Sequence, residues 1–329
     1  MTVADLGPAL TEFQSAVAST DSVAALAVVD AALAAGTDPV SLLTEVVGAA
    51  QRVVGEKWQR GEWSVAEEHA ATAVAMSATE AIAREVRRRP IVRGRVVVAC
   101  AEREWHALPA MMIDCALRSD GWNTTLLGAS TPALRLSQYL QDLGPDALAV
   151  SCSVLGSLPT TRRFIEASRA AGIPVLVGGP AFGPDDLRAR GLGATAWAAD
   201  ASDAIEIMRA MPAVVSAAEP LPAGEVAEQA ALELAHSGLV ADLMSRWPGI
   251  ACDLDPDLVK DSIEQLLHAV WAALLTADPR PISQTVWWVS ALLEFRAQSP
   301  SLLDDLRIEL TRTLRDYPLA TNLLDTSWP

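Results

Sequence analysis

The sequence has 329 residues, of which 51% are hydrophobic and 20% charged, and its net charge is −16. A chain of this length has room for two or three domains, each with its own core. The acidic balance argues against direct nucleic-acid binding, which relies on Lys and Arg to displace counterions from phosphate. We expect neither a leader nor a membrane segment, because no apolar run approaches the roughly 18 residues that a membrane helix needs. A soluble, cytoplasmic protein is therefore expected.

The first 90 residues place apolar side chains at helical spacing only. Asp21 and Asp38 are suited to begin helices, and Ser64 with Glu67 forms a capping box after the break at Gly61. Four antiparallel helices of this length pack as a bundle. The expected helices span 6–19, 21–35, 39–60 and 65–89, and we predict a helical bundle over residues 1–90.

From residue 95 the apolar pattern changes to strands that alternate with helices. Strands that are apolar throughout and separated by helices indicate a parallel sheet covered on both faces. For residues 91–212 we predict a flavodoxin-like, doubly wound parallel sheet of five strands, in which ligands bind beyond the carboxyl ends of the strands. The expected strands are 95–101, 123–128, 147–153, 174–179 and 194–199, and the expected helices are 107–119, 132–143, 158–171, 185–190 and 202–211.

The last part of the chain returns to helices. A stretch rich in Pro and Ala at 213–224 indicates a linker. Residues 225–329 show no strand pattern, and their helices are expected at 225–247, 256–277, 282–298 and 301–316, with prolines between them. We predict a third, all-helical domain, which makes the fold class multidomain α and α/β.

Three loops at the carboxyl ends of predicted strands carry candidate site residues. His106 follows the first strand, two residues after Glu104. A carboxylate near a metal-ligating histidine can hold its second ring nitrogen, fix its tautomer and raise its basicity. Ser153-x-Leu155 ends the third strand and Gly178-Gly179 ends the fourth, where a hydroxyl and small residues suit the tail of a bulky ligand. Each element alone has a structural alternative, because such histidines and glycine pairs are common in sheets of this type.

The three elements together resemble the cobalamin-binding domain shared by methionine synthase, corrinoid proteins and adenosylcobalamin photoreceptors. That family's motif is Asp-x-His-x-x-Gly, then Ser-x-Leu, then Gly-Gly; here the first element is Glu104-x-His106-x-x-Pro109. The resemblance implies that His106 replaces the cofactor's benzimidazole as the lower cobalt ligand. It also implies that Ser153 contacts the displaced benzimidazole and that the glycines admit the nucleotide tail. Pro109 departs from the motif. The implied cofactor-binding residues also include Glu104, Trp105, Gly128 and Leu155.

The bundle carries a second resemblance, to the light-dependent cobalamin repressors, whose bundle caps the upper face of the cofactor. Trp58 is followed after nine residues by Glu68-His69. The resemblance implies that Trp58 lies over the adenosyl group, while Glu68 can accept hydrogen bonds from ribose hydroxyls. Alternatively, Trp58 is a core residue and Glu68 balances the helix dipole. Gln59 replaces the histidine that ligates cobalt in the repressors after photolysis, which leaves the upper ligand open, with His69 as a candidate.

The C-terminal helices carry aromatic residues that suggest a second chromophore. The candidates for its site are His268, Trp271, Trp287, Trp288 and Arg296. The domain order resembles that of photocobilins, whose C-terminal sensor domain is globin- or phycobiliprotein-like. The resemblance implies a bilin such as biliverdin, with aromatic walls, His268 at the pyrrole N–H groups and Arg296 at the propionates. The alternative is that the tryptophans fill a bundle core or a dimer interface.

The sequence therefore predicts a light sensor rather than an enzyme. Light is expected to cleave the cobalt–carbon bond of adenosylcobalamin, after which the bundle repacks against the sheet domain. A homo-oligomer and a downstream protein partner are expected. Two alternatives stay open. One is a corrinoid protein that carries methyl groups for a methyltransferase system, and the other is an interaction scaffold with a vestigial cobalamin site.

Overall fold

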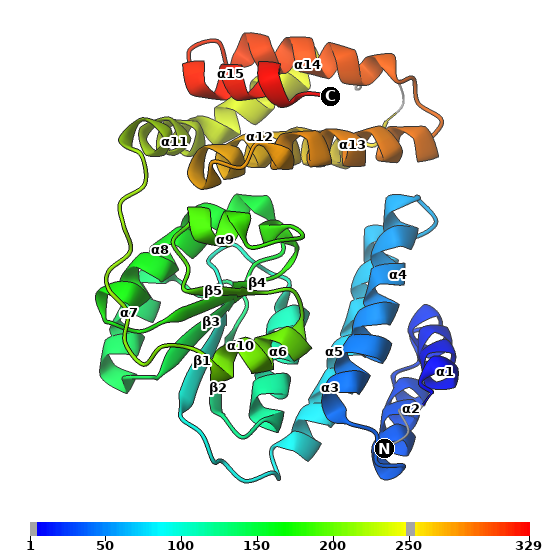
Figure 1. Cartoon of the computed structure of the whole chain (residues 1–329). Coiled ribbons are helices and arrows are strands. Elements are labelled where there is room, and N and C mark those ends of the chain that lie inside the picture. The colour runs from blue at the N-terminus through cyan, green and yellow to red at the C-terminus, as the bar shows by residue number, and fades with distance from the viewer. Residues whose placement is uncertain (1–4, 248–253) are drawn as a thin grey trace.

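The computed structural model describes residues 5–247 and 254–329 of the chain. A helical bundle and a sheet domain lie side by side, and C-terminal helices extend across the ends of both (Figure 1). This arrangement confirms the predicted fold class.

The N-terminal bundle begins where its capping residues predict. Asp21 accepts hydrogen bonds from the N–H groups at the start of the second helix, and Asp38 does so for the third. Both hydrogen bonds of the Ser64–Glu67 capping box are present. The expected helix over 39–60 contains a π-helical segment, η1, in its middle. The elements are α1 (Gly7–Ala18), α2 (Ser22–Ala34), α3 (Pro39–Ser41), η1 (Leu42–Val47), α4 (Gly48–Gln59) and α5 (Val65–Val86).

The central domain is a five-stranded parallel sheet with the order β2-β1-β3-β4-β5. β1 pairs with β3 on one side and with β2 on the other, so the strand order reverses between β1 and β3. The loops that follow these two parallel strands therefore lie next to each other. The strands are β1 (Arg95–Cys100), β2 (Asn123–Gly128), β3 (Ala147–Ser151), β4 (Val175–Gly178) and β5 (Ala196–Ala198). The helices are α6 (Ala107–Ser119), α7 (Ala133–Leu143), η2 (Leu155–Ser157), α8 (Leu158–Ala170), η3 (Pro180–Phe182), α9 (Leu187–Gly191) and α10 (Ala201–Arg209).

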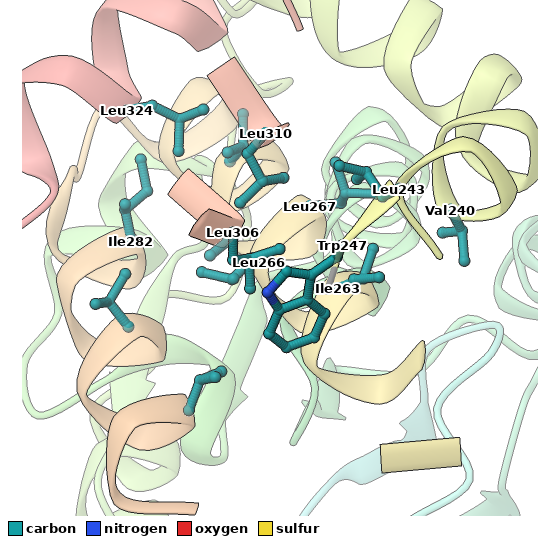
Figure 2. Close-up of a cluster of buried hydrophobic side chains, with 14 of the residues drawn as sticks. Val240, Leu243, Trp247, Ile263, Leu266, Leu267, Ile282, Leu306, Leu310 and Leu324 are labelled. Carbon is teal, nitrogen blue, oxygen red and sulfur yellow. The ribbon is translucent and has the colours of Figure 1, made fainter. Parts of the chain in front are cut away.

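The C-terminal domain packs its helices around an apolar core that includes the indole of Trp247 (Figure 2). The indole N–H donates to the carbonyl of Leu302 at 2.8 Å, so this buried donor is satisfied. The helices are α11 (Ala223–Arg246), α12 (Pro256–Thr276), α13 (Arg280–Phe295), α14 (Ser301–Thr313) and α15 (Pro318–Ser327). The sequence did not predict α15. Pro318 was interpreted as a break between elements, but it lies in the first turn of a new helix, where proline's missing N–H costs nothing.

The C-terminal domain is fixed to the sheet domain through the turn between α12 and α13. Arg188 and Asp278 are both buried there and form an ion pair at 2.9 Å, and Arg188 also donates to the carbonyl of Ala181. Gly191 lies so close to α12 that an added Cβ would be 2.4 Å from the carbonyl oxygen of Thr276. Among the helices of the described residues, none combines the length and apolarity needed to cross a membrane.

Candidate functional site

Glu104 and His106 form the centre of the site, in the loop between β1 and α6. The carboxylate of Glu104 is fully buried, and its Oε1 lies 2.7 Å from Nδ1 of His106. The backbone N–H of His106 donates to the same oxygen at 2.8 Å. Oε2 accepts from the N–H groups of Ser153 at 2.5 Å and Val154 at 3.0 Å, in the loop after β3. One buried carboxylate thus joins the loops after β1 and β3.

These hydrogen bonds shift the pKa values of both members of the pair. Burial opposes ionisation of Glu104, but the hydrogen bonds from His106 and Ser153 outweigh it and hold the pKa of this carboxyl below its ordinary value. The hydrogen bond to Glu104 raises the pKa of His106, and the charge of Glu68 on the bundle contributes to the same effect. Because Nδ1 faces Glu104, Nε2 is the ring nitrogen available to a metal. The His106 side chain is 58% exposed, so that nitrogen is accessible.

A cavity of about 290 Å³ lies at the carboxyl ends of β3, β4 and β5, with Val98 of β1 also in its lining. Gly178 and Gly179 line it, and neither can carry a side chain: an added Cβ would lie 2.8 Å from the carbonyl oxygen of Ala198 and 2.4 Å from that of Cys152, respectively. Gly179 also has φ +103°, which favours glycine. Ser151 lines the cavity too, and its buried hydroxyl has no hydrogen-bond partner among the described residues.

This cavity fits the tail of a corrinoid, because it combines apolar walls with an unpaired hydroxyl. The structure places Ser151 in the lining, whereas Ser153 lies outside it and uses its N–H to hold Glu104. Leu155 packs between the cores of the sheet and C-terminal domains. The sequence missed Ser151 because β3 was expected to continue to residue 153 and ends at Ser151. In Ser-Cys-Ser, that two-residue difference decides which serine lies at the end of the strand.

The upper end of the bundle meets the C-terminal domain. The ring of Trp58 stacks on that of Trp288 in α13, with centroids 6.0 Å apart and planes at 22°. Arg296 donates from Nη1 to the carbonyl of Gln59 at 3.0 Å. Figure 1 shows α13 lying over the upper end of α4. The upper end of the bundle is therefore held by residues of another domain.

The other predicted cofactor residues lie in loops and helix ends around this region. Glu68 accepts a hydrogen bond from Thr72 at 2.9 Å, and His69 lies 3.5 Å from Glu68 with its side chain 74% exposed. Trp105 is also exposed, beside His106. Gly128 ends β2 with φ +80° and has open space where a Cβ would be. These exposed groups are available to a ligand bound between the bundle and the sheet.

The structure does not support the predicted bilin site. His268 packs against Gly156 and lies 4.8 Å, ring to ring, from Trp271. Trp288 is stacked on Trp58, and Arg296 is hydrogen-bonded to the bundle. Trp287 is 61% exposed. The site was implied by the resemblance in domain order, but these side chains are engaged in packing contacts within and between domains, with the exception of Trp287.

Comparisons with known proteins agree with a corrinoid site. A B12 binding domain model matches residues 94–208, and a second B12 binding domain model matches residues 9–83. The HTH-type transcriptional repressor CarH of Myxococcus xanthus is 31% identical over 158 residues, which are 47% of this chain and 52% of the repressor. The chain therefore spans about half the length of that relative. Trimethylamine corrinoid protein 1 of Methanosarcina acetivorans is 25% identical over 205 residues, which are 60% of this chain and 94% of the relative.

A solved structure shows the same fold. The Methanosarcina barkeri monomethylamine corrinoid protein superposes with a TM-score of 0.56 at 17% identity, over 63% of this chain and all of that protein. The ranges that the two B12 binding domain models match cover most of the bundle and the whole sheet. The findings support a cobalamin-binding family for this chain and cobalamin binding by it. A transcriptional repressor and corrinoid proteins both occur among its relatives.

Proposed function

We propose that the chain is an adenosylcobalamin-dependent photoreceptor, a sensor rather than a catalyst. The observation that carries the proposal is the contact between the upper end of the bundle and α13, where Trp58 stacks on Trp288 and Arg296 holds the carbonyl of Gln59. A methyl carrier must expose the upper face of its cofactor to a second enzyme. Here Trp58, which is expected over that face, packs against another domain of the same chain. The Methanosarcina acetivorans carrier is matched over 94% of its length by only 60% of this chain, so the chain extends beyond the carrier.

Each site residue has a role in this proposal. His106 would hold the cobalt through Nε2, and Glu104 fixes the tautomer of His106. Gly178, Gly179 and Ser151 receive the nucleotide tail, with the Ser151 hydroxyl as its hydrogen-bond donor. These roles use the free ring nitrogen of His106 and the cavity-lining hydroxyl that has no hydrogen-bond partner among the described residues.

The upper face belongs to the bundle. Trp58 would form its aromatic wall, Glu68 would accept hydrogen bonds from the ribose hydroxyls, and His69 is the candidate upper ligand, since Gln59 cannot take that role. Adenosylcobalamin supplies a cobalt–carbon bond that light cleaves. Movement of Trp58 and Gln59 passes to Trp288 and Arg296, because these pairs are in direct contact. The bundle and α13 then form the two-state element that a switch requires.

The test is optical. The protein is loaded with adenosylcobalamin in the dark, and its absorption spectrum is recorded before and after green light. A light-dependent change that is lost in His106→Ala is expected. Trp288→Ala should change how light alters the contact between the bundle and the C-terminal domain, while Trp287→Ala, an exposed neighbour on the same helix, serves as the matched control. An unchanged wild-type spectrum under strong light refutes the photoreceptor.

The second candidate is a corrinoid protein that carries methyl groups, which the nearly full-length match to the trimethylamine corrinoid protein favours. Trp58→Ala separates the two candidates. A photoreceptor should lose retention of adenosylcobalamin in this variant while its affinity for methylcobalamin changes little. In a carrier, the variant's affinities for adenosylcobalamin and for methylcobalamin should both change little. The homo-oligomer and the downstream protein partner stay predictions, and sedimentation of the loaded protein in the dark and after light tests the first of them.

A further inference from the structure

The loop that holds Glu104 is covered by the C-terminal domain. The imidazole of His268, on α12, lies directly over Gly156 in the short helix η2. An added Cβ on Gly156 would be 2.7 Å from Cε1 of that ring and 2.8 Å from its Nδ1. This close approach explains why Nδ1 of His268 is buried without a hydrogen-bond partner among the described residues. The backbone at Gly156 does not adopt a positive φ, so backbone conformation does not call for glycine there. The lack of space beneath the His268 ring does.

The imidazole of His268 is itself held in place by aromatic neighbours. It stacks on His236 of α11, with centroids 5.0 Å apart and planes at 16°, and Trp271 closes the third side. Burial lowers the pKa of His268 to about 3, so the ring is neutral at physiological pH. A neutral ring wedged between two helices and a turn acts as a rigid spacer.

The turn under His268 is the one that fixes the Glu104 carboxylate. Ser153 and Val154, immediately before η2, donate both of their N–H groups to Oε2 of Glu104. Oε1 of the same carboxylate holds His106. A continuous series of contacts therefore runs from α12 through Gly156 and the 153–154 backbone to Glu104 and His106.

A second contact with the C-terminal domain involves the residue before Glu104. Arg103 directly precedes Glu104, and its guanidinium lies 3.5 Å from Glu233 of α11. The same glutamate lies 3.6 Å from Arg163 of α8. Arg103 also has φ +71°, a conformation that surrounding contacts must stabilise. Both segments that meet at Glu104 are thus in contact with the C-terminal helices.

We propose that the C-terminal domain sets the position of the lower cobalt ligand through one positioning residue, His268 on the 153–157 turn, with the partly exposed Glu233–Arg103 ion pair beside it. The inference rests on the proposed role of His106 as that ligand. No hydrogen bond among the described residues joins His268 to His106, and His268 acts through Glu104. Because coupling between sites is reciprocal, a change at the lower ligand is transmitted back to α11 and α12. This gives the C-terminal domain a lower-face connection to the cofactor in addition to the Trp58–Trp288 contact above it.

The experiment uses the full chain and four variants. Gly156→Ala places a methyl group against the His268 ring, His268→Ala removes the ring, and the double variant does both. Gly238→Ala on α11 is the matched control, because nothing lies within 4 Å of its added Cβ. Melting temperatures identify any variant that fails to fold. Amide hydrogen exchange of Ser153 and Val154 is measured in the cofactor-free protein. Electron paramagnetic resonance of bound cobalt(II) cobalamin, in protein labelled with nitrogen-15 histidine, reports the fraction of cobalt that carries an imidazole nitrogen.

Gly156→Ala is expected to speed exchange at Ser153 and Val154 by about tenfold, since overpacking of this kind shifts neighbouring backbone. The fraction of cobalt with a histidine nitrogen should fall in the same variant. The double variant should lie closer to wild type than Gly156→Ala, because the new methyl group takes the space of the missing ring. Gly238→Ala should match wild type in both measurements.

Two results overturn the proposal. One is unchanged exchange and unchanged imidazole ligation in a folded Gly156→Ala protein, and the other is a double variant whose effects simply add. If wild-type protein shows no histidine nitrogen on cobalt, the proposed role of His106 fails. In that case the exchange rates of Ser153 and Val154 still decide whether His268 positions the loop around Glu104.

Discussion

Replacing Glu104 by glutamine tests the centre of the site. Glu104 accepts four hydrogen bonds, two on each carboxylate oxygen, from His106, Ser153 and Val154. Glutamine keeps one oxygen and turns the other into an NH₂ donor, so two N–H groups lose their acceptor in either orientation. Hydrogen bonds to a charged group contribute about 1.5–3 kcal/mol each, which gives roughly 3–6 kcal/mol as an upper limit for the loss.

Most of this loss is expected in folding stability, because the bonds to the loop exist with and without cofactor. The part that reaches cobalamin affinity is the loss of ligand orientation, for which about 10–100-fold is usual when such a partner is removed. Cobalamin titration followed by absorption measures the affinity, and urea unfolding measures the stability. Glu102→Gln is the control, since it removes the same charge two residues away from Glu104. Glu102 accepts a hydrogen bond only at its backbone carbonyl, and its side chain makes none to the described residues. Equal affinities for Glu104→Gln and Glu102→Gln would refute the reasoning.

Three further predictions concern the cavity, the ion pair in the domain interface and pH. Ser151→Ala should lower affinity for cobalamin by roughly 2–10-fold, the value of one neutral hydrogen bond, but leave affinity for tail-less cobinamide unchanged; equal losses for both would contradict the tail contact. Asp278→Asn should destabilise the chain by about 3–5 kcal/mol in urea unfolding, because it leaves the buried Arg188 charge without its partner; a loss below about 1 kcal/mol would contradict this. The pKa of His106 is raised, so its ion pair with Glu104 stabilises the cofactor-free protein fully below the unfolded histidine pKa of about 6.5 and is lost as pH rises through the raised value. The free energy of unfolding should therefore be larger at pH 6 than at pH 9, and this difference should shrink in His106→Asn.

The fold could be predicted because its signals are local. The capping residues Asp21, Asp38 and Ser64 begin helices where expected, and apolar strands alternate with helices in the order that gives a parallel sheet. The missing element, α15, follows from an ambiguity of proline, which ends one helix and can begin another. The choice between Ser151 and Ser153 needed the end of β3 to within one residue, and boundaries are where sequence patterns are least certain.

Contacts between domains lie beyond what sequence spacing contains. Trp58 and Trp288 are far apart in the chain, and no periodic pattern links them, yet their rings stack. The packing of His268 on Gly156 depends on how α12 docks on the sheet domain, which is set by interactions such as the Arg188–Asp278 ion pair. His268 and Trp271 are three residues apart on one helix and their rings are in contact, but sequence alone could not tell a ligand pocket from a packed interface.

The stack of Trp58 on Trp288 can form only late in synthesis. The bundle and the sheet domain leave the ribosome first, and domains generally fold as they emerge. At about 5–20 residues per second, α13 follows α4 by roughly 10 to 50 seconds. Throughout that interval Trp58 lacks its aromatic partner. The nascent bundle therefore exposes one face of the Trp58 ring until the last helices are made.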